Sequence, residues 1–160
     1  MSNFKTLASV ILALVGLGFN PAIAGQQTLE FKLVTTRIDG KEVKYDQVEG
    51  QSVGVSKAFG VASFKDGRIA TKDFVHSWDL NKGSGPFFGY STYYFEDGSS
   101  LTMRYSGNQR AGQPLHGDYV ILSGTGAFAN ATGTGTFDGV VPNKLPGSAQ
   151  YTGKFVINTP

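Results

Sequence analysis

The chain has 160 residues, contains no cysteine and carries a formal net charge of +2 at pH 7. So small a charge does not favour nucleic acid or an anionic membrane surface as a partner. The lack of cysteine excludes disulfides, thiol chemistry and thiolate metal sites. Packing and sheet hydrogen bonds must therefore hold the fold together.

The first 24 residues have the pattern of a secretory signal peptide. Lys5 supplies a positive charge, residues 7–17 form an apolar run, and Ala-Ile-Ala at 22–24 is typical of a signal peptidase site. The run is short for a membrane span, which leaves a retained anchor as the alternative. We expect an exported protein, periplasmic or secreted, with one domain over residues 25–160.

Beyond residue 24 the sequence predicts strands and turns. Apolar, β-branched and aromatic runs recur about every 10 to 15 residues, without a sustained helical spacing. The predicted strands are residues 29–33, 52–56, 58–64, 68–78, 87–95, 101–105, 119–122, 134–137 and 151–157. This spacing is typical of an all-β barrel or sandwich.

Two Asp-Gly steps, at 66–67 and 97–98, lie between strand-like flanks. They predict β-hairpins with type I′ turns, in which both central residues have positive φ. Consecutive hairpins favour an antiparallel, up-and-down barrel. Loops at 81–86 and 107–117 are long enough to shape an opening, and residues 140–147 form a third connection.

The segment 117–139 contains the form G-x-G-x-x-A at 124–129. A dinucleotide-binding fingerprint would need a helix there and an acidic residue about 20 positions later. The residues that follow are rich in Gly and Thr, which are poor helix formers. The sequence therefore does not predict a nucleotide-binding site, and we expect no cofactor. Glycines that permit close approach of strands, with Phe128 and Phe137 as apolar anchors, indicate a small barrel instead.

The order DGSSLTMRYSG, a loop, and GDYVILSGTGAFANATGTGTF over residues 97–139 resembles the allene oxide cyclase-like and dirigent-like barrel superfamily. Its members carry a similar glycine-rich strand pair late in the chain. The resemblance implies an eight-stranded antiparallel up-and-down (calycin-like) β-barrel with a ligand cavity, often a homotrimer. Dirigent-like members have a cavity arginine on the strand before this loop, and Arg104 is at the comparable place. No counterpart of the family's catalytic carboxylates is found, so no activity is carried over.

Strand 68–78 supplies two candidate ligand-binding residues. Alternation places His76 and Trp78 on one face with Ala70, Lys72 and Phe74. An imidazole among aromatic rings suits general acid or base work near neutral pH. The alternative is a histidine at the barrel mouth or in a subunit contact.

Arg104 and Glu30 complete the candidate ligand-binding set. A buried guanidinium needs an anionic partner, either a carboxylate such as Glu30 or a bound ligand. If its face looks into the lumen, Arg104 holds a ligand's carboxylate or carbonyl group. If that face looks outward, Arg104 is a solvated or trimer-interface residue.

Strand 87–95 carries aromatic residues on both faces, so both of its faces should be covered. Subunit packing would bury the outer row, and the alternative cover is a plugging loop or a terminal segment. His76 and His116 are too few and too far apart to predict a metal site.

The resemblance, with the candidate site residues, implies a barrel that binds a small apolar or aromatic molecule in its lumen. A cavity that excludes water and orients its ligand can also catalyse a cofactor-free isomerisation or cyclisation. The rival is a structural or interaction protein with a solid-packed barrel. The two are distinguished by whether the interior holds a contiguous void.

Overall fold

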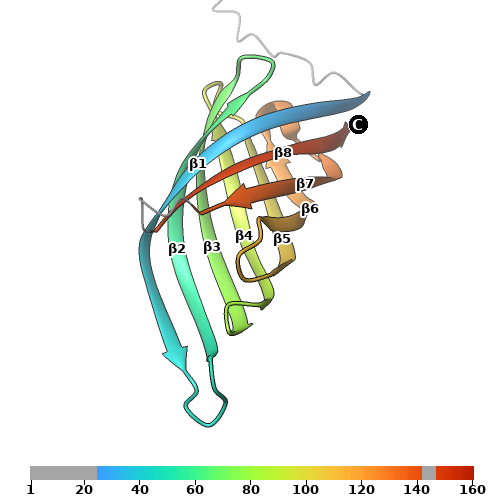
Figure 1. Cartoon of the computed structure of the whole chain (residues 1–160). Coiled ribbons are helices and arrows are strands. Elements are labelled where there is room, and N and C mark those ends of the chain that lie inside the picture. The colour runs from blue at the N-terminus through green and yellow to red at the C-terminus, as the bar shows by residue number, and fades with distance from the viewer. Residues whose placement is uncertain (1–24, 142–146) are drawn as a thin grey trace, which may run out of the picture.

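The computed structural model describes residues 25–141 and 147–160; the expected signal peptide lies outside the described residues. Eight antiparallel strands form a closed barrel in chain order, and β8 closes it by pairing with β1 (Figure 1). The strands are β1 (Gly25–Lys44), β2 (Gln51–Phe64), β3 (Ile69–Asn81), β4 (Gly85–Phe95), β5 (Ser100–Gln109), β6 (Leu115–Thr125), β7 (Thr132–Val140) and β8 (Ser148–Thr159). The predicted up-and-down barrel is thereby confirmed. Within these ranges no helix is long or apolar enough to cross a membrane.

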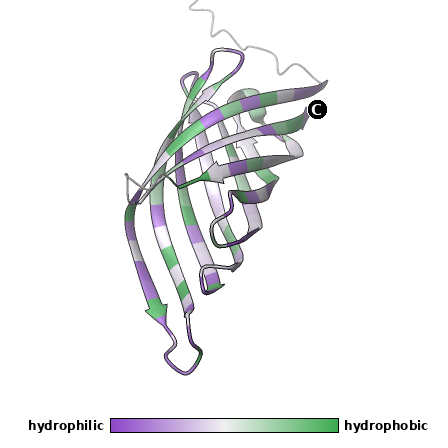
Figure 2. Cartoon of the chain, viewed as in Figure 1, coloured by the Kyte–Doolittle hydropathy of each residue, from purple (hydrophilic) through white to green (hydrophobic). Residues whose placement is uncertain are grey.

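Side chains alternate between the lumen and the outer surface, as the pleat of a strand requires. On β1, Leu29, Phe31 and Leu33 are buried, whereas Glu30 and Lys32 between them are exposed. The same alternation appears as changing hydropathy along the strands in Figure 2. The core of the protein is therefore the barrel interior itself.

Both predicted hairpins are present, but their turn type differs from the prediction. Only the glycines, Gly67 and Gly98, have positive φ, at 94° and 81°. The Gly67 N–H donates to the Phe64 carbonyl at 3.0 Å, and the Gly98 N–H to the Phe95 carbonyl at 3.1 Å. This is the pattern of a type I turn followed by a left-handed glycine, which spares the aspartate the positive φ that type I′ demands.

The predicted strand bounds need two corrections. Residues 52–56 and 58–64 belong to one strand, β2, because Lys57 simply occupies an outward position in an unbroken alternation. β1 continues far beyond residue 33, since the Asp39-Gly40 step lies at a register shift within the β1–β2 ladder and makes no turn.

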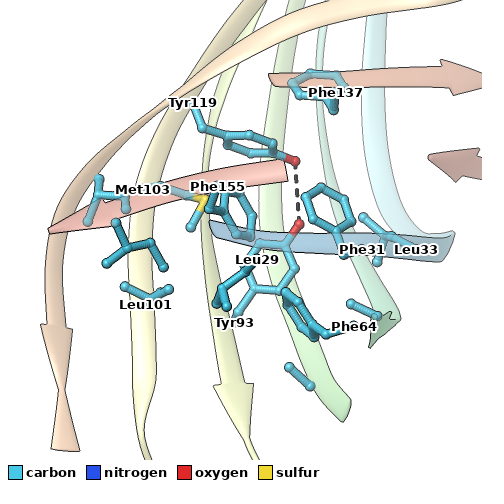
Figure 3. Packing of buried hydrophobic residues seen from close by; sticks show 14 of the residues in the cluster. Leu29, Phe31, Leu33, Phe64, Tyr93, Leu101, Met103, Tyr119, Phe137 and Phe155 are labelled. Atoms are coloured by element: carbon cyan, nitrogen blue, oxygen red, sulfur yellow. Dashed lines mark hydrogen bonds between the residues drawn. The ribbon is translucent and has the colours of Figure 1, made fainter. Parts of the chain in front are cut away.

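One end of the barrel is packed solid with aromatic and aliphatic side chains. Phe31 and Phe155 stack there with ring centres 4.8 Å apart, and Phe95 lies 4.8 Å from Phe128. Figure 3 shows this cluster, with Leu29, Leu101 and Met103 closing around the rings. The anchors expected at Phe128 and Phe137 are both buried, which confirms them.

The other end is open, and β1 and β2 extend past it. β1 pairs with β8 only as far as Thr36, and from there to Lys44 it pairs with β2 alone. The resulting hairpin projects below the barrel in Figure 1. Exposed residues at this side, Arg37 and Val141, line the cavity inside the barrel, so the lumen can be reached from here.

Candidate ligand-binding site

A cavity of about 200 Å³ lies in the lumen between the open end and the packed end. Lys72 and Tyr119 are its most deeply buried polar residues, and Arg37, Gln109 and Val141 lie toward its mouth. Its aromatic walls are Phe74, His76, Phe87, Tyr105, Phe137 and Tyr151. An apolar enclosure with a few convergent polar groups is the usual form of a small-molecule site.

Lys72 occupies an inward position of β3 and is only 4% exposed. Its Nζ donates a hydrogen bond to the Tyr119 hydroxyl at 3.0 Å. The centres of four rings lie 4.7–5.4 Å from Nζ, those of Phe74, Tyr93, Tyr105 and Tyr119. Within residues 25–141 and 147–160 no carboxylate forms an ion pair with it.

Burial without a counter-charge weakens the charged form of this amine. Desolvation lowers the pKa of Lys72 from 10.5 to about 7. The faces of the four rings offset part of this cost through cation–π attraction. At neutral pH the amine therefore exists in both its protonated and its neutral form.

Tyrosine hydroxyls continue the polar path from Lys72. The Tyr119 and Tyr93 hydroxyl oxygens are 3.4 Å apart, joined by the dashed line in Figure 3. Burial raises the pKa of both phenols well above the ordinary value, so they remain neutral hydrogen-bond donors and acceptors. A ligand oxygen near Lys72 would meet donors and no fixed negative charge.

His76 also faces the cavity, where Tyr105 fixes its ring. The Tyr105 hydroxyl donates to the Val75 carbonyl at 2.8 Å, so its oxygen is free to accept from His76 Nδ1, 3.3 Å away. Gly89 makes this arrangement fit, because a Cβ there would lie 2.3 Å from the Tyr105 hydroxyl oxygen. The arrangement leaves Nε2 of His76 as an acceptor.

The electrostatic surroundings keep His76 neutral. Burial lowers the pKa of His76 to about 4, and the positive charges of Arg37 and Lys72 act in the same direction. The cavity therefore presents an imidazole rather than an imidazolium at neutral pH. His76 can accept a hydrogen bond or a proton, but it is not poised as a general acid there.

Trp78 lies one inward position beyond His76, at the mouth. The Trp78 ring stacks with the His76 ring, with 5.8 Å between the ring centres. The Arg37 guanidinium lies 5.0 Å from the centre of the Trp78 ring. Gly54 on β2 lets the indole lie flat across the neighbouring strand. Trp78 contacts His76 but does not line this cavity; it lines a separate pocket with Glu42, Tyr45 and Leu80.

The other two candidates from the sequence lie outside the barrel. Arg104 is exposed on the outer face of β5, with its guanidinium 5.8 Å from the ring centre of Phe88. Glu30 is exposed on β1 and forms a surface ion pair with Lys65 at 3.3 Å. Strand parity corrects the expectation that they meet a ligand in the lumen, because Leu101, Met103 and Tyr105 are the inward residues of β5, and Leu29 and Phe31 are those of β1. For Arg104 the outward alternative is the one observed.

Sequence reasoning missed Lys72, Tyr105 and Tyr119 as site residues. The available signal was the parity of β3, which places Lys72 between Ala70 and Phe74 on the face that His76 shares. A lysine at an inward position of a barrel strand is rarely buried without a function or a partner. The contact with Tyr119 spans 47 residues of sequence, and no local pattern predicts it.

No family model and no curated protein match this chain. Solved structures of similar fold do exist. The pterocarpan synthase dirigent protein GePTS1 has a TM-score of 0.59 at 16% identity, with 100% of both chains covered. The pterocarpan synthase dirigent protein PsPTS1 has a TM-score of 0.58 at 14% identity, covering 84% of this chain and 95% of that one.

The chain has the barrel fold of the dirigent proteins. A third similar structure, a protein of unknown function from the DUF3224 family of Shewanella oneidensis, has a TM-score of 0.48 at 16% identity, covering 86% of this chain and 99% of that one. The similarity to the two dirigent proteins, at 16% and 14% identity, shows the barrel fold alone, and the activity has to be argued from the site.

Proposed function

We propose that this dirigent-like barrel is exported and binds a small apolar or aromatic molecule in its lumen, with an oxygen atom of the ligand directed toward Lys72. The observation that carries this proposal is an amine buried in an aromatic cavity without a carboxylate partner among the described residues. Burying such a group destabilises the fold unless something compensates for the lost hydration. A ligand oxygen beside Lys72 and Tyr119 would provide that compensation.

The cavity size sets the scale of the ligand. Its volume of about 200 Å³ exceeds that of an engineered cavity of about 150 Å³ that holds benzene. One substituted aromatic ring fits inside, and a longer molecule would extend past His76 toward Trp78. The aromatic walls favour an apolar body, while Lys72 and Tyr119 favour an oxygen at its inner end.

A solid-packed structural barrel is the rival explanation, and the packed end agrees with it. The open end disagrees with it. A purely structural barrel would have an aliphatic side chain in place of Lys72, because such a side chain fills the same space without a desolvation cost. A buried amine in an aromatic cavity, without a carboxylate partner among the described residues, therefore favours ligand binding over packing.

Catalysis of a cofactor-free isomerisation or cyclisation is the finer form of the proposal. Lys72 and Tyr119 could polarise a ligand oxygen, and the walls could hold the reacting atoms together away from water. The probe is 2′-hydroxychalcone, whose phenol oxygen adds to the β-carbon of the enone while the phenol proton is replaced by one at the α-carbon, so the ring closes without an oxidant or a cofactor. An enzyme would accelerate the closure in proportion to protein concentration, and Lys72→Met would abolish the acceleration; an unchanged rate would leave the protein a binder.

Calorimetry with two probes tests the binding proposal. Benzyl alcohol should bind at pH 7 about 10- to 100-fold more tightly than toluene, the range for a hydrogen bond to a charged group. Lys72→Met should remove this preference, and Lys57→Met, on the outer face of β2, should leave it intact. Absence of benzyl alcohol binding, or a preference that survives Lys72→Met, would contradict the proposal.

We also propose assembly into a homotrimer through the outer face of β4. Phe88, Tyr90 and Tyr94 are 45%, 47% and 49% exposed there, more aromatic surface than a lone barrel needs. A second copy of the chain is the occupant that the superfamily resemblance suggests. Light scattering of the exported form should give a trimer that Tyr90→Asp dissociates, and a wild-type monomer at micromolar concentration would contradict this assembly.

A further inference from the structure

Lys72 has the surroundings of a lysine that acts as a nucleophile. It is the innermost amine of the cavity, its Nζ contacts one hydroxyl oxygen, and four ring faces surround it. No carboxylate holds it in its protonated form within the described residues. Lysines desolvated in apolar pockets are the ones that attack carbonyl groups, because the neutral amine carries the required lone pair.

None of the charged and titratable groups around Lys72 favours the protonated form of its amine. On its own strand His76 is neutral above a pKa of about 4. Burial raises the pKa values of Tyr93 on β4, Tyr105 on β5 and Tyr119 on β6. Burial also raises the pKa of Tyr151 on β8 to about 12, and Arg37 on β1 adds a positive charge at the mouth. Among the described residues no carboxylate lines the cavity, so no negative charge beside the amine opposes its deprotonation.

We propose that Lys72 forms a Schiff base with the aldehyde or ketone group of an apolar or aromatic molecule that enters the cavity. This inference rests on the proposed function, because the molecule must first occupy the site. The cavity has room for one aromatic ring with its carbonyl group beside Nζ. The substrate class is therefore a carbonyl compound with a small apolar body.

The reaction needs no oxidant and no co-reactant. The Nζ lone pair adds to the carbonyl carbon, and the proton that nitrogen loses passes to the carbonyl oxygen. The Tyr119 hydroxyl, 3.0 Å from Nζ, can relay that proton because a phenol both accepts and donates. The carbinolamine nitrogen then gives its second proton to the new hydroxyl group. The carbon–oxygen bond breaks, a C=N bond replaces it, and one molecule of water leaves for each carbonyl consumed.

Reductive trapping with benzaldehyde tests this inference. The full mature protein is incubated at pH 7 with benzaldehyde and sodium cyanoborohydride, and the product is examined by intact mass and peptide mapping. We expect one benzyl group per chain, located on Lys72 by mapping of the wild-type protein, so that this readout depends on no variant. Label spread over exposed lysines, or no label, would overturn the inference.

Variants and pH sharpen the test. Lys72→Met should abolish the label and Lys57→Met should retain it; a label that persists in Lys72→Met would overturn the inference. The labelling rate should rise as the pH passes through about 7 and then level off, following the pKa of Lys72. A rate that keeps rising toward pH 10 would indicate an ordinary exposed amine and would contradict the inference.

Benzyl alcohol separates the two proposals, because it can occupy the cavity but cannot form an imine. If calorimetry shows benzyl alcohol binding while benzaldehyde leaves no label on Lys72, the Schiff base is overturned and the binding function stands. If benzyl alcohol does not bind, the binding function is overturned, and the Schiff base that rests on it falls as well.

Discussion

The two ends of the barrel carry different kinds of side chain at the inward positions of the same strands. At the packed end, inward positions carry Phe31, Phe64 and Phe155, whose rings interlock and exclude space for a ligand. At the open end, the inward positions of β3 carry Lys72 and His76 around a cavity of about 200 Å³. The difference indicates that the packed end supplies stability while the open end gives up stability for polar groups that a ligand can use.

The largest effect should come from the packed end. Phe155 is fully buried and contacts the rings of Phe31, Tyr93 and Tyr119, so Phe155→Ala should lower the free energy of unfolding by about 3 to 5 kcal/mol. Phe74→Ala, at the edge of the existing cavity, should cost less than half as much. Urea denaturation measures both, and equal losses would erase the distinction between the ends.

The pH dependence of stability should come from the open end. The pKa of Lys72 is 10.5 in an unfolded chain and about 7 in the fold, so between these values the unfolded state binds more protons. The free energy of unfolding should therefore rise with pH across this window, by up to about 1.4 kcal/mol per pH unit, and Lys72 adds no slope below pH 7. Urea titrations of Lys72→Met should show a flatter profile, and Lys57→Met should keep the wild-type slope.

A smaller loss should follow when Tyr105 is changed to phenylalanine. The change removes the hydrogen bond to the Val75 carbonyl and the partner of His76, which should cost about 1 to 2 kcal/mol. Tyr94→Phe, on the outer face, is the matched control and should change the free energy of unfolding negligibly. Thermal or urea unfolding that failed to separate the two variants would contradict the described contacts.

The smallest effect should come from Arg104. Its side chain is exposed, so Arg104→Met should change stability by no more than about 0.5 kcal/mol and should leave benzyl alcohol binding unaltered. Calorimetry compares the benzyl alcohol affinity of this outer-wall variant with that of Lys72→Met. A weakened affinity would restore Arg104 as a site residue.

The sequence predicted the barrel because its signals are local. Alternation and Asp-Gly hairpins each act over a few residues and predicted the antiparallel up-and-down order, whereas the closed eight-stranded barrel was what the superfamily resemblance implied. Alternation also placed His76 and Trp78 on one face, but it did not reveal which face of β5 looks inward. Arg104 and Glu30 were chosen for their chemistry, whereas burial of Leu101, Met103 and Tyr105 decides the orientation of β5.

The contacts that make the cavity could not be predicted in this way. Tyr119 meets Lys72 only because the barrel closes across its lumen, and the pKa of Lys72 depends on that enclosure. Gly89 matters only because Tyr105 crosses β4 to reach Val75. Such relations depend on distances through space, which a single sequence does not encode in any local pattern.

The most direct test of the open-end account is an NMR titration of protein labelled with ¹³C at the lysine side chains. One lysine signal should titrate near pH 7, should disappear in Lys72→Met and should shift when benzyl alcohol is added. A spectrum in which every lysine titrates near the ordinary value of about 10.4 would contradict a buried amine without a counter-charge, and with it the proposed site.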